Sequence, residues 1–194
     1  MGIFIIVFWL AIAAEIAIRA PISRRQQEEA KSEQRSSTQE KVLLGLLSFS
    51  GFLAPLIYSA TSWLNFANYS LPAWAGWLGF VLILSAIFIF WRGHADLGLN
   101  WSPTLEIRTE HKLITNGIYG VIRHPMYASQ WIWIMAQSLL LQNWVAGFLS
   151  IPVWILFYFL RVPAEEQMMV DKFGTEYREY MSRTGAVFPK GKEV

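Results

Sequence analysis

The sequence predicts an all-α, polytopic integral membrane protein with five transmembrane helices. Of its 194 residues, 54% are hydrophobic and only 15% are charged, whereas soluble domains carry about 25% charged residues. The charged residues are also absent from three long blocks, 2–14, 42–91 and 124–160. Because about 20 apolar residues cross a bilayer core as a helix, these blocks must face lipid. A soluble domain, a disordered chain and a nucleic-acid binder are therefore excluded, and the lipid bilayer is the expected surroundings.

The first apolar block predicts a span over about residues 3–19. No basic residue precedes it, while Arg19 and two further arginines follow it. This is the reverse of a secretory signal peptide, so we expect an anchoring helix with its N-terminus outside. Glu15 lies four residues before Arg19, so the two can pair on one helix face, or Glu15 can line a polar site within the membrane. The mixed-charge segment 20–41 is interpreted as a solvated loop or a short surface helix.

The second apolar block, residues 42–91, is long enough for two spans. Turn-forming residues between 65 and 72 divide it, which predicts helices over about 42–63 and 73–92. Pro55 should kink the first of these helices, because it cannot donate a backbone hydrogen bond. A membrane tolerates such a kink where a neighbouring helix satisfies the freed carbonyl.

The third block, residues 124–160, is too long for one span and too short for two ordinary ones. The polar pair Gln142 and Asn143 interrupts it, so we expect a tight hairpin of helices over about 125–141 and 145–160. Both helices are near the lower length limit for crossing a bilayer.

The basic residues provide an independent test of five spans. Of the 16 Lys and Arg residues, six lie in 19–41, four in 92–123 and six in 161–194, so the turns 64–72 and 142–144 contain none. Five spans and an outside N-terminus place every basic segment on the cytoplasmic side, as the positive-inside rule requires. We therefore expect a multi-pass protein of the cell membrane with a cytoplasmic C-terminus. The predicted cytoplasmic segments are 20–41, 93–124 and 161–194.

In this topology, polar residues that could form a binding or catalytic site occur in two cytoplasmic segments, 93–124 and 161–194. The first is too short for a Rossmann unit, and the chain has no Gly-x-Gly-x-x-Gly sequence, so a nucleotide-like ligand would bind in a pocket formed by helix ends and loops. Pro125 suits the first turn of a helix whose free N–H groups would point to this pocket, with His124 beside it. The three histidines lack ligand spacing and there is no cysteine, so no metal site is predicted.

The second segment begins with Arg161 and Glu165, which are four residues apart and share a helix face if the helix continues. Pro163 lies between them, so a kink or a new helix starting there is expected. Arg161 could instead be an interfacial anchor whose side chain reaches the lipid head groups. Glu165 and Glu166 could likewise be a solvated first helical turn.

Together these segments resemble a known family. The run His111-Lys112-Leu113-Ile114-Thr115-x-Gly117-x-Tyr119-x-x-x-Arg123-His124-Pro125-x-Tyr127 resembles the cofactor motif of the isoprenylcysteine carboxyl methyltransferases. The later run Arg161-x-x-x-Glu165-Glu166, then Phe173-Gly174-x-x-Tyr177-x-x-Tyr180-x-x-Arg183, resembles their C-terminal signature. The resemblance covers roughly residues 92–189, and the short five-span form looks most like the archaeal-type members.

This resemblance implies one membrane methyltransferase domain over residues 1–194, with S-adenosylmethionine as methyl donor and S-adenosylhomocysteine as product. The acceptor would be a lipophilic small molecule or a lipidated group, most simply a prenylcysteine-like carboxylate. Arg161 would hold this carboxylate, and Arg161 and Glu165 would be the catalytic pair. The implied cofactor-binding residues are His111, Lys112, Leu113, Ile114, Tyr119, His124, Pro125, Met126, Tyr127 and Glu165.

Three alternatives stay open on the sequence alone. A membrane NADPH-dependent reductase of related helical layout would need a denser basic cluster for the 2′-phosphate than Lys112 and Arg123 provide. A phospholipid N-methyltransferase would need a base, for which Glu165 and Glu166 are the nearby groups. A small membrane scaffold or transporter is the non-enzymatic alternative. The sequence leaves the acceptor, the choice between O- and N-methylation and the oligomeric state open.

Overall fold

The computed structural model describes residues 2–29, 38–98 and 112–191, and within these ranges every regular element is helical. The α-helices are α1 (Gly2–Glu29), α2 (Thr38–Ser48), α3 (Ala54–Ala60), α4 (Ala73–Leu97), α5 (Pro125–Leu141), α6 (Ser150–Phe173) and α7 (Thr175–Arg183). Short 3-10 turns cover Asn65–Ala67 and Gly117–Gly120, and π-helical turns cover Phe49–Leu53 and Trp144–Phe148. The predicted all-α class is therefore confirmed.

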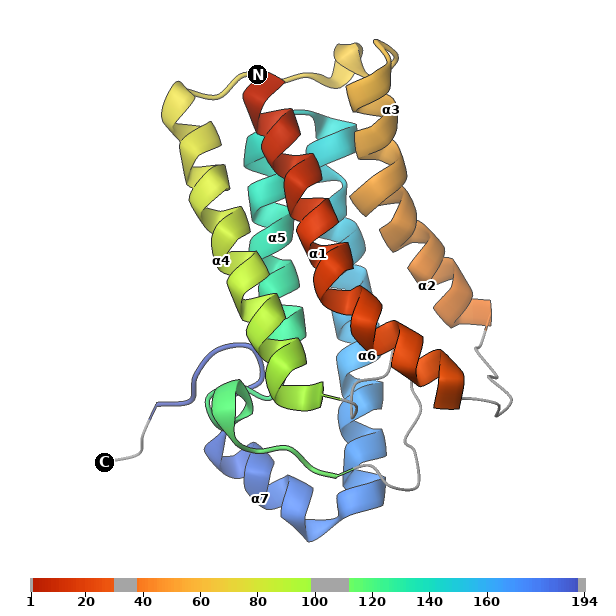
Figure 1. Cartoon of the computed structure of the whole chain (residues 1–194), viewed down its shortest axis with the longest axis vertical. Helices are drawn as coiled ribbons and strands as arrows, with labels where there is room; N and C mark the ends of the chain where they lie inside the picture. Colours follow the sequence, from red (N-terminus) through yellow and green to blue (C-terminus); the bar gives the residue numbers. More distant parts are fainter. Residues whose placement is uncertain (1, 30–37, 99–111, 192–194) are drawn as a thin grey trace.

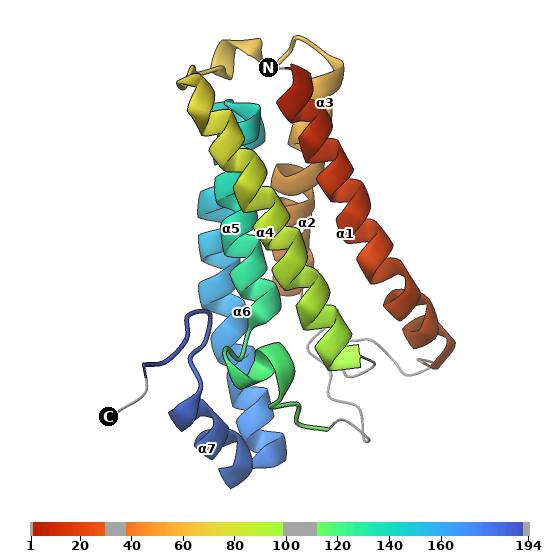
Figure 2. The same cartoon turned by 60° about the vertical axis from the view of Figure 1, so that its left-hand side comes forward.

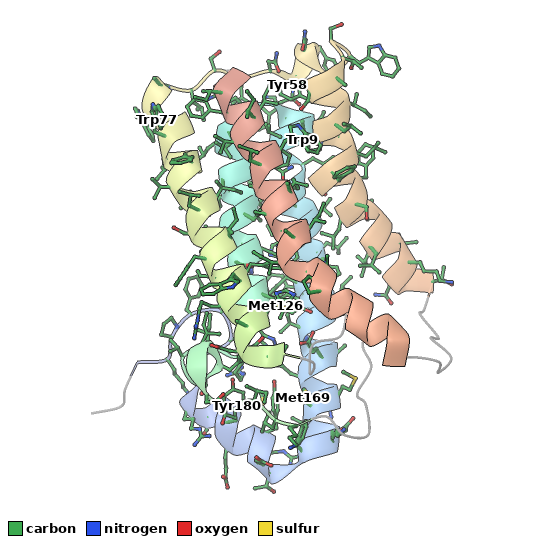
Figure 3. The ribbon with its side chains drawn as sticks, viewed as in Figure 1. Trp9, Tyr58, Trp77, Met126, Met169 and Tyr180 are labelled. Atoms are coloured by element: carbon green, nitrogen blue, oxygen red, sulfur yellow. The ribbon has the colours of Figure 1, made fainter. Side chains whose placement is uncertain are left out.

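The long helices stand side by side in one bundle (Figure 1). The N-terminus lies at one end, and α7 lies at the other together with the 112–120 segment. Figure 2 shows α4 and α5 adjacent along the bundle. The side chains of Trp9, Tyr58 and Trp77 lie in the half near the N-terminus, and Met169 and Tyr180 lie at the opposite end (Figure 3).

Four candidate membrane spans meet the length and hydropathy expected of a crossing helix among the described residues. They are Gly2–Pro21, Lys41–Ala60, Ala73–Leu97 and Trp144–Phe173. Helix α5 has only 17 residues, which at 1.5 Å per residue is shorter than a bilayer core. Its buried face also carries polar side chains such as Gln137 and Ser138. A multi-pass membrane protein is thus supported, and the fifth span stays a prediction.

The core of the bundle lies around α5. Its buried members include Phe8 and Ala11 of α1, Ile83 and Ala86 of α4, and Trp133 of α5. Small residues allow these helices to approach closely, since at Gly79 a Cβ would be 3.0 Å from the Leu139 side chain. Because the neighbouring helices cover α5, its polar groups face protein rather than lipid.

The turns at the N-terminal end are fastened to each other by Asn143, which is fully buried. Its Oδ1 accepts hydrogen bonds from the backbone N–H groups of Val145 and Ala146, at 3.0 and 2.9 Å. Its Nδ2 donates to Leu64 O and Asn68 Oδ1, at 2.8 and 2.9 Å. The polar interruption that predicted a hairpin therefore also joins that hairpin to the 64–72 turn.

Helix α1 continues to Glu29. The first part of the segment 20–41 is therefore helical, as one of the two expectations had it, but it extends the first span instead of forming a separate surface helix. Pro21 lies inside α1, where proline usually breaks a helix. The residues that follow include Gln26, Gln27, Glu28 and Glu29, which are good helix formers. The high helix propensity of these residues favours continuation of α1 beyond Pro21 and beyond the apolar block.

The two other prolines that were expected to disturb helices behave differently from each other. Just before Pro55 the helix adopts the π-helical turn Phe49–Leu53, and the carbonyl of Ser50 in this turn accepts a hydrogen bond of 2.9 Å from Gln137 Nε2. Pro163, in contrast, lies inside a continuous α6, so no new helix starts there. The carbonyl that loses its hydrogen-bond donor belongs to Phe159, which is exposed like Pro163. The backbone can therefore bend slightly at this point without displacing residues of the core.

Candidate functional site

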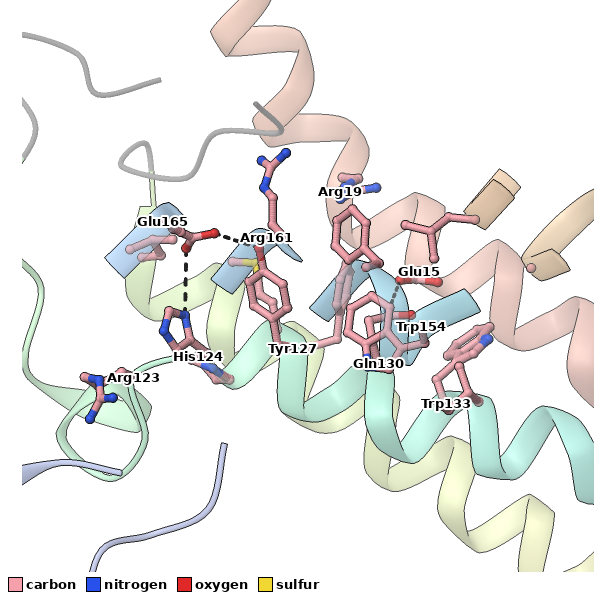
Figure 4. Close-up of a pocket in the computed structure, with 18 of the residues that line it drawn as sticks. Glu15, Arg19, Arg123, His124, Tyr127, Gln130, Trp133, Trp154, Arg161 and Glu165 are labelled. Atoms are coloured by element: carbon pink, nitrogen blue, oxygen red, sulfur yellow. Dashed lines mark hydrogen bonds and ion pairs between the residues drawn. The ribbon is translucent and has the colours of Figure 1, made fainter. Parts of the chain in front are cut away.

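A cavity of about 510 Å³ opens at the α7 end of the bundle and continues between the helices. Its lining residues come from α1, α2, the following π-helical turn, α4, α5, α6, α7 and the segment between α4 and α5. Figure 4 shows part of it, with His124, Arg161 and Glu165 toward one side and Gln130, Trp133 and Trp154 toward the other. One cavity therefore joins polar groups at the helix ends to the apolar interior.

The segment before α5 is positioned by Asp96 of α4. Arg92 forms an ion pair with Asp96 at 2.9 Å, and Asp96 Oδ2 accepts a hydrogen bond of 2.8 Å from the N–H of Ile118. Gly117 has φ +59°, and a Cβ at this position would lie 2.7 Å from the Asp96 Cγ atom. Glycine is required here both for its left-handed backbone and for its lack of a side chain.

Tyr119 continues this segment into the wall of the cavity. Its hydroxyl donates to Gly93 O at 3.3 Å, and its carbonyl accepts a hydrogen bond of 2.5 Å from the hydroxyl of Tyr180. Burial raises the pKa of Tyr180 to about 12 and also raises the pKa of Tyr119. Both hydroxyls thus remain protonated donors at neutral pH and connect α4, the segment and α7.

The start of α5 is held by the residues that follow α7, which we call the strap (184–186). The N–H groups of Arg123 and His124 donate to Gly185 O and Ala186 O, at 2.8 and 2.9 Å. The Arg123 guanidinium also donates to Thr184 O, and a single parallel bridge pairs Ile122 with Gly185. Backbone groups far apart in the sequence therefore fix the entry to the helix.

Glu166 is the centre of a buried charge network beside the strap. Its Oε1 atom accepts hydrogen bonds from Arg123 Nε and Nη2, at 3.1 and 2.8 Å, and lies 3.0 Å from His124 Nε2. Because an ionised carboxylate can only accept, the ring proton of His124 belongs on Nε2. The side chains of Arg123 and His124 are only 10% and 5% exposed, so this network is largely shielded from solvent.

Glu165 has a different environment although it is the adjacent residue. It accepts a 2.6 Å hydrogen bond from the Tyr127 hydroxyl, and His124 Nδ1 lies 3.8 Å away, beyond hydrogen-bond distance. Its side chain is 31% exposed and lines the cavity. Glu165 can therefore bind a ligand, whereas Glu166 is occupied by Arg123 and His124.

Tyr127 and Arg161 form the wall that faces Glu165. The ring of Tyr127 packs among Trp154, Phe157 and Tyr158, with centroid distances of 5.8, 6.3 and 6.0 Å. Arg161 is 8% exposed, and its guanidinium carbon is 5.9 Å from the centroid of the Phe157 ring. A side chain that reached out to lipid head groups would be exposed, so the interfacial-anchor alternative does not fit its burial.

The cavity brings most of the residues expected from the sequence together. Those that line it are Lys112, Leu113, Ile114, Tyr119, His124, Pro125, Met126, Tyr127, Arg161 and Glu165. His111 lies outside the described residues. No group of three His, Cys, Asp or Glu side chains suited to a metal occurs in the part of the chain that is described.

Several lining residues were not expected from the sequence. Tyr177 and Tyr180 line the cavity, and their place in the C-terminal signature was the available signal. Gln130 and Glu15 also line it, and for Glu15 the interpretation as a polar lining group had been left open. The role of the strap had no signal, because it acts through backbone carbonyls.

Comparison with known proteins matches residues 77–171 to the isoprenylcysteine carboxyl methyltransferase family. Protein-S-isoprenylcysteine O-methyltransferase B of Arabidopsis thaliana is 29% identical over 119 residues, covering 60% of this chain and 60% of its own length. The Schizosaccharomyces pombe enzyme is 36% identical over 81 residues, covering 41% and 34%. The human enzyme is 29% identical over 150 residues, covering 71% and 52%.

A solved structure has the same fold. The eukaryotic intramembrane Ras methyltransferase, isoprenylcysteine carboxyl methyltransferase, superposes with a TM-score of 0.59 at 21% identity, covering 94% of this chain and 63% of the other. The matched part of the chain spans 60% or less of the length of the curated relatives named above. The family match covers most of α4, the 112–124 segment, α5 and nearly all of α6. Residues 77–171 are therefore similar in sequence to the isoprenylcysteine carboxyl methyltransferase family, and the helical arrangement is similar to that of its solved eukaryotic member.

Proposed function

We propose that this chain is an S-adenosylmethionine-dependent methyltransferase that esterifies a carboxylate on a lipophilic acceptor, such as a prenylcysteine-like group. The observation that carries the proposal is the single cavity that joins the 112–127 residues, Arg161 and Glu165 to a lining inside the bundle. The curated relatives are named as enzymes that methylate isoprenylcysteine. Their names and this cavity support the same reaction.

The residues at the α7 end suit the polar groups of S-adenosylmethionine. Glu165 has acceptor capacity left beyond its bond from Tyr127, which suits an ammonium group. The first turn of α5, with Pro125 as its first residue, presents N–H groups that favour a carboxylate. Lys112 and Tyr119 form the neighbouring wall. When bound there, the cofactor supplies a methyl group activated by a positively charged sulfur.

Arg161 has the chemistry to hold the acceptor. A carboxylate is ionised at pH 7, and a guanidinium can bind both of its oxygens at once. In the transfer a carboxylate oxygen forms a bond to the methyl carbon while the carbon–sulfur bond breaks, which leaves a neutral thioether. Such an in-line displacement needs alignment and exclusion of water rather than a base.

The state of the two glutamates favours a carboxylate acceptor over an amine. An amine would lose a proton during methylation, so a base would be needed. Glu166 is bound to Arg123 and His124, and Glu165 is the residue proposed above to bind the ammonium group of the cofactor. A carboxylate acceptor uses this site as it is, and we therefore propose O-methylation.

The acceptor and the cofactor would reach the cavity from different sides. Ile12, Leu47 and Phe52 of the lining lie in candidate membrane spans, and they suit a hydrocarbon chain that enters from the bilayer. The polar cofactor would enter from the α7 end. This arrangement requires the α7 end to be cytoplasmic, so we further propose five spans, an outside N-terminus and a location in the cell membrane.

The first test is calorimetry on detergent-purified protein with S-adenosylhomocysteine and, separately, NADPH. We expect binding of S-adenosylhomocysteine alone. Tight binding of NADPH with no binding of S-adenosylhomocysteine would support a reductase and refute the proposal.

The second test measures turnover of a prenylcysteine analogue by Arg161→Ala. Loss of a bidentate charged contact should lower kcat/KM roughly 100-fold and change the affinity for S-adenosylhomocysteine little. Arg161→Lys should also be slow, because an ammonium cannot reproduce the two parallel bonds. Arg178→Ala, at an exposed position of α7, is the control. A parental rate in Arg161→Ala would exclude Arg161 as the acceptor site.

A further inference from the structure

The end of the cavity away from Glu165 is bounded by Gln137 of α5. Gln137 is the last α5 residue in the lining and is fully buried. Its Nε2 donates to Ser50 O in the π-helical turn after α2 and to Ala146 O in the turn before α6, at 2.9 and 2.7 Å. The side chain therefore joins α5 to two other parts of the chain, and it cannot swing aside without breaking both hydrogen bonds.

Aromatic contacts close the bundle just beyond this end of the cavity. Ile12 is the first α1 residue in the lining. Trp9, about one turn before it, packs edge to face against Phe52, with a ring centroid distance of 5.5 Å. The ring of Phe8 packs against that of Trp133 of α5 at 6.1 Å. A hydrocarbon chain that fills the cavity therefore has to end near this level.

The length of the cavity can be read from the two helices that line it. From Tyr127 to Gln137 is ten residues of α5, or about 15 Å at 1.5 Å per residue. From Arg161 to Ser150, the first α6 residue in the lining, is eleven residues, or about 16 Å. An extended chain advances about 1.2 Å per bond, so a farnesyl chain spans about 14 Å and a geranylgeranyl chain about 19 Å. The cavity thus matches the shorter chain.

The amide of Gln137 is also a poor surface for a hydrocarbon chain. Its orientation is fixed, because both partners of Nε2 are carbonyl oxygens, which can only accept. Its Oε1 is then a buried acceptor with no hydrogen-bond partner among the residues that the structure describes. A chain pressed against this oxygen would keep donors away and supply none. Gln137 therefore opposes a longer chain both by its fixed position and by its polarity.

The other polar side chains of the cavity lie where a chain of either length would pass. Glu15 and Gln130 are hydrogen-bonded to each other at 2.7 Å. The indole N–H of Trp154 has no hydrogen-bond partner in the described part of the chain, but its ring lies 5.8 Å from that of Tyr127, close to the polar end (Figure 4). These groups affect both chains alike, whereas Gln137 is reached by the longer chain alone.

We propose that Gln137 limits the length of the hydrocarbon chain on the acceptor. A chain of farnesyl size ends at Gln137, and a chain one isoprene unit longer has to displace the amide or fold back inside the cavity. Gln137 is then a residue that determines specificity, at a distance from the carboxylate that Arg161 holds. This inference rests on the proposed methyl transfer, and it narrows the acceptor within the same chemical class.

The experiment compares N-acetyl-S-farnesylcysteine with N-acetyl-S-geranylgeranylcysteine, each supplied at the same mole fraction of vesicle lipid so that partitioning does not favour either probe. We expect the parent to prefer the farnesyl probe roughly tenfold in kcat/KM, the cost of overfilling a packed site by a few carbons. Gln137→Ala should remove most of this preference by speeding the longer probe, a gain that a folding defect cannot produce. Gln130→Ala, the same substitution at a position that both chains pass, should keep the parental ratio.

Equal use of both probes by the parent would overturn the inference and leave the methyl transfer standing. A parental ratio in folded Gln137→Ala would overturn it as well. Because this variant also loses the bonds to Ser50 and Ala146, binding of S-adenosylhomocysteine checks that it is folded. If it is not, Gln137→Asn takes its place; it retains an amide but is one methylene shorter, so it should speed the longer probe by a smaller factor, and an unchanged ratio would refute the role of Gln137.

If the parent methylates neither probe, the proposed acceptor reaction is wrong, and the length limit is tested by binding alone. Trp133 and Trp154 line the cavity, so a change in tryptophan fluorescence reports the bound probe. Tighter binding of the farnesyl probe that disappears in Gln137→Ala supports the limit, and equal binding of both probes by the parent refutes it.

Discussion

Substituting Glu165 and Glu166 one at a time by glutamine should have different effects. One change should mainly lower the stability of the fold, and the other should mainly weaken ligand binding. Glu166 Oε1 receives three hydrogen bonds from Arg123 and His124. Hydrogen bonds to a charged group are worth about 1.5–3 kcal/mol and neutral ones about 0.5–1.5, so Glu166→Gln loses about 1 kcal/mol for each bond. Because the Glu166 side chain is 19% exposed and therefore partly screened, we expect a total loss of about 2–3 kcal/mol.

The neighbouring substitution has a smaller expected cost. Glu165 accepts one bond, from the uncharged Tyr127 hydroxyl, and a glutamine can still accept it. Glu165→Gln should therefore cost about 1 kcal/mol or less. It should nevertheless weaken S-adenosylhomocysteine binding roughly tenfold, since the negative charge that faces the ligand's ammonium group is lost.

Thermal unfolding and calorimetry on the same detergent-solubilised samples measure both effects. For a chain of this size, the loss in Glu166→Gln corresponds to a Tm lowered by about 5–10 °C. Glu179→Gln, at an exposed position of α7 beyond its first turn, should change neither measurement. The reasoning fails if Glu166→Gln melts with the parent, or if Glu165→Gln loses more stability than Glu166→Gln.

Two further predictions concern the turn before α5 and the topology. Gly117→Ala should lower the affinity for S-adenosylhomocysteine, because a Cβ would meet the Asp96 carboxylate. Gly98→Ala is the control, since its φ is also positive but a Cβ there meets no other described residue within 4 Å; comparable losses in both variants would refute the role of Asp96. Cysteines placed at Ser70 and Gly191 of this cysteine-free chain should be labelled by an impermeant reagent from opposite sides of the membrane, and labelling from one side would contradict an odd number of spans.

Much of the architecture follows from apolar blocks and charge, because lipid imposes one simple rule on the backbone. Helix α4 begins at Ala73 as expected, and Asn143 forms the predicted hairpin turn. The exceptions lie where two local tendencies compete. Proline disfavours a helix at Pro21 and Pro163, but good helix formers after the first and an exposed face around the second allow α1 and α6 to continue.

The parts of the site that are formed by side chains could be predicted from the sequence, whereas the contacts made by backbone groups could not. The motif residues around His124 and Tyr127 line the cavity as expected. The resemblance singled out Glu165, but residue spacing alone did not separate the roles of Glu165 and Glu166. Successive residues of a helix point about 100° apart, and only the packing of α6 against α5 decides which one meets Arg123. The strap contributes carbonyl oxygens, which every residue type possesses, so no sequence pattern could indicate it.

The strap also determines when the site can form during synthesis. Residues 184–186 follow all the predicted spans in the chain, yet they bond to Arg123 and His124 at the start of α5. A nascent chain emerges from the ribosome N-terminus first, so the helices can enter the membrane before the strap exists. A product that stops after α6 would therefore insert and pack but lack a fixed entry to α5. Completion of the binding site thus reports that translation has passed residue 186.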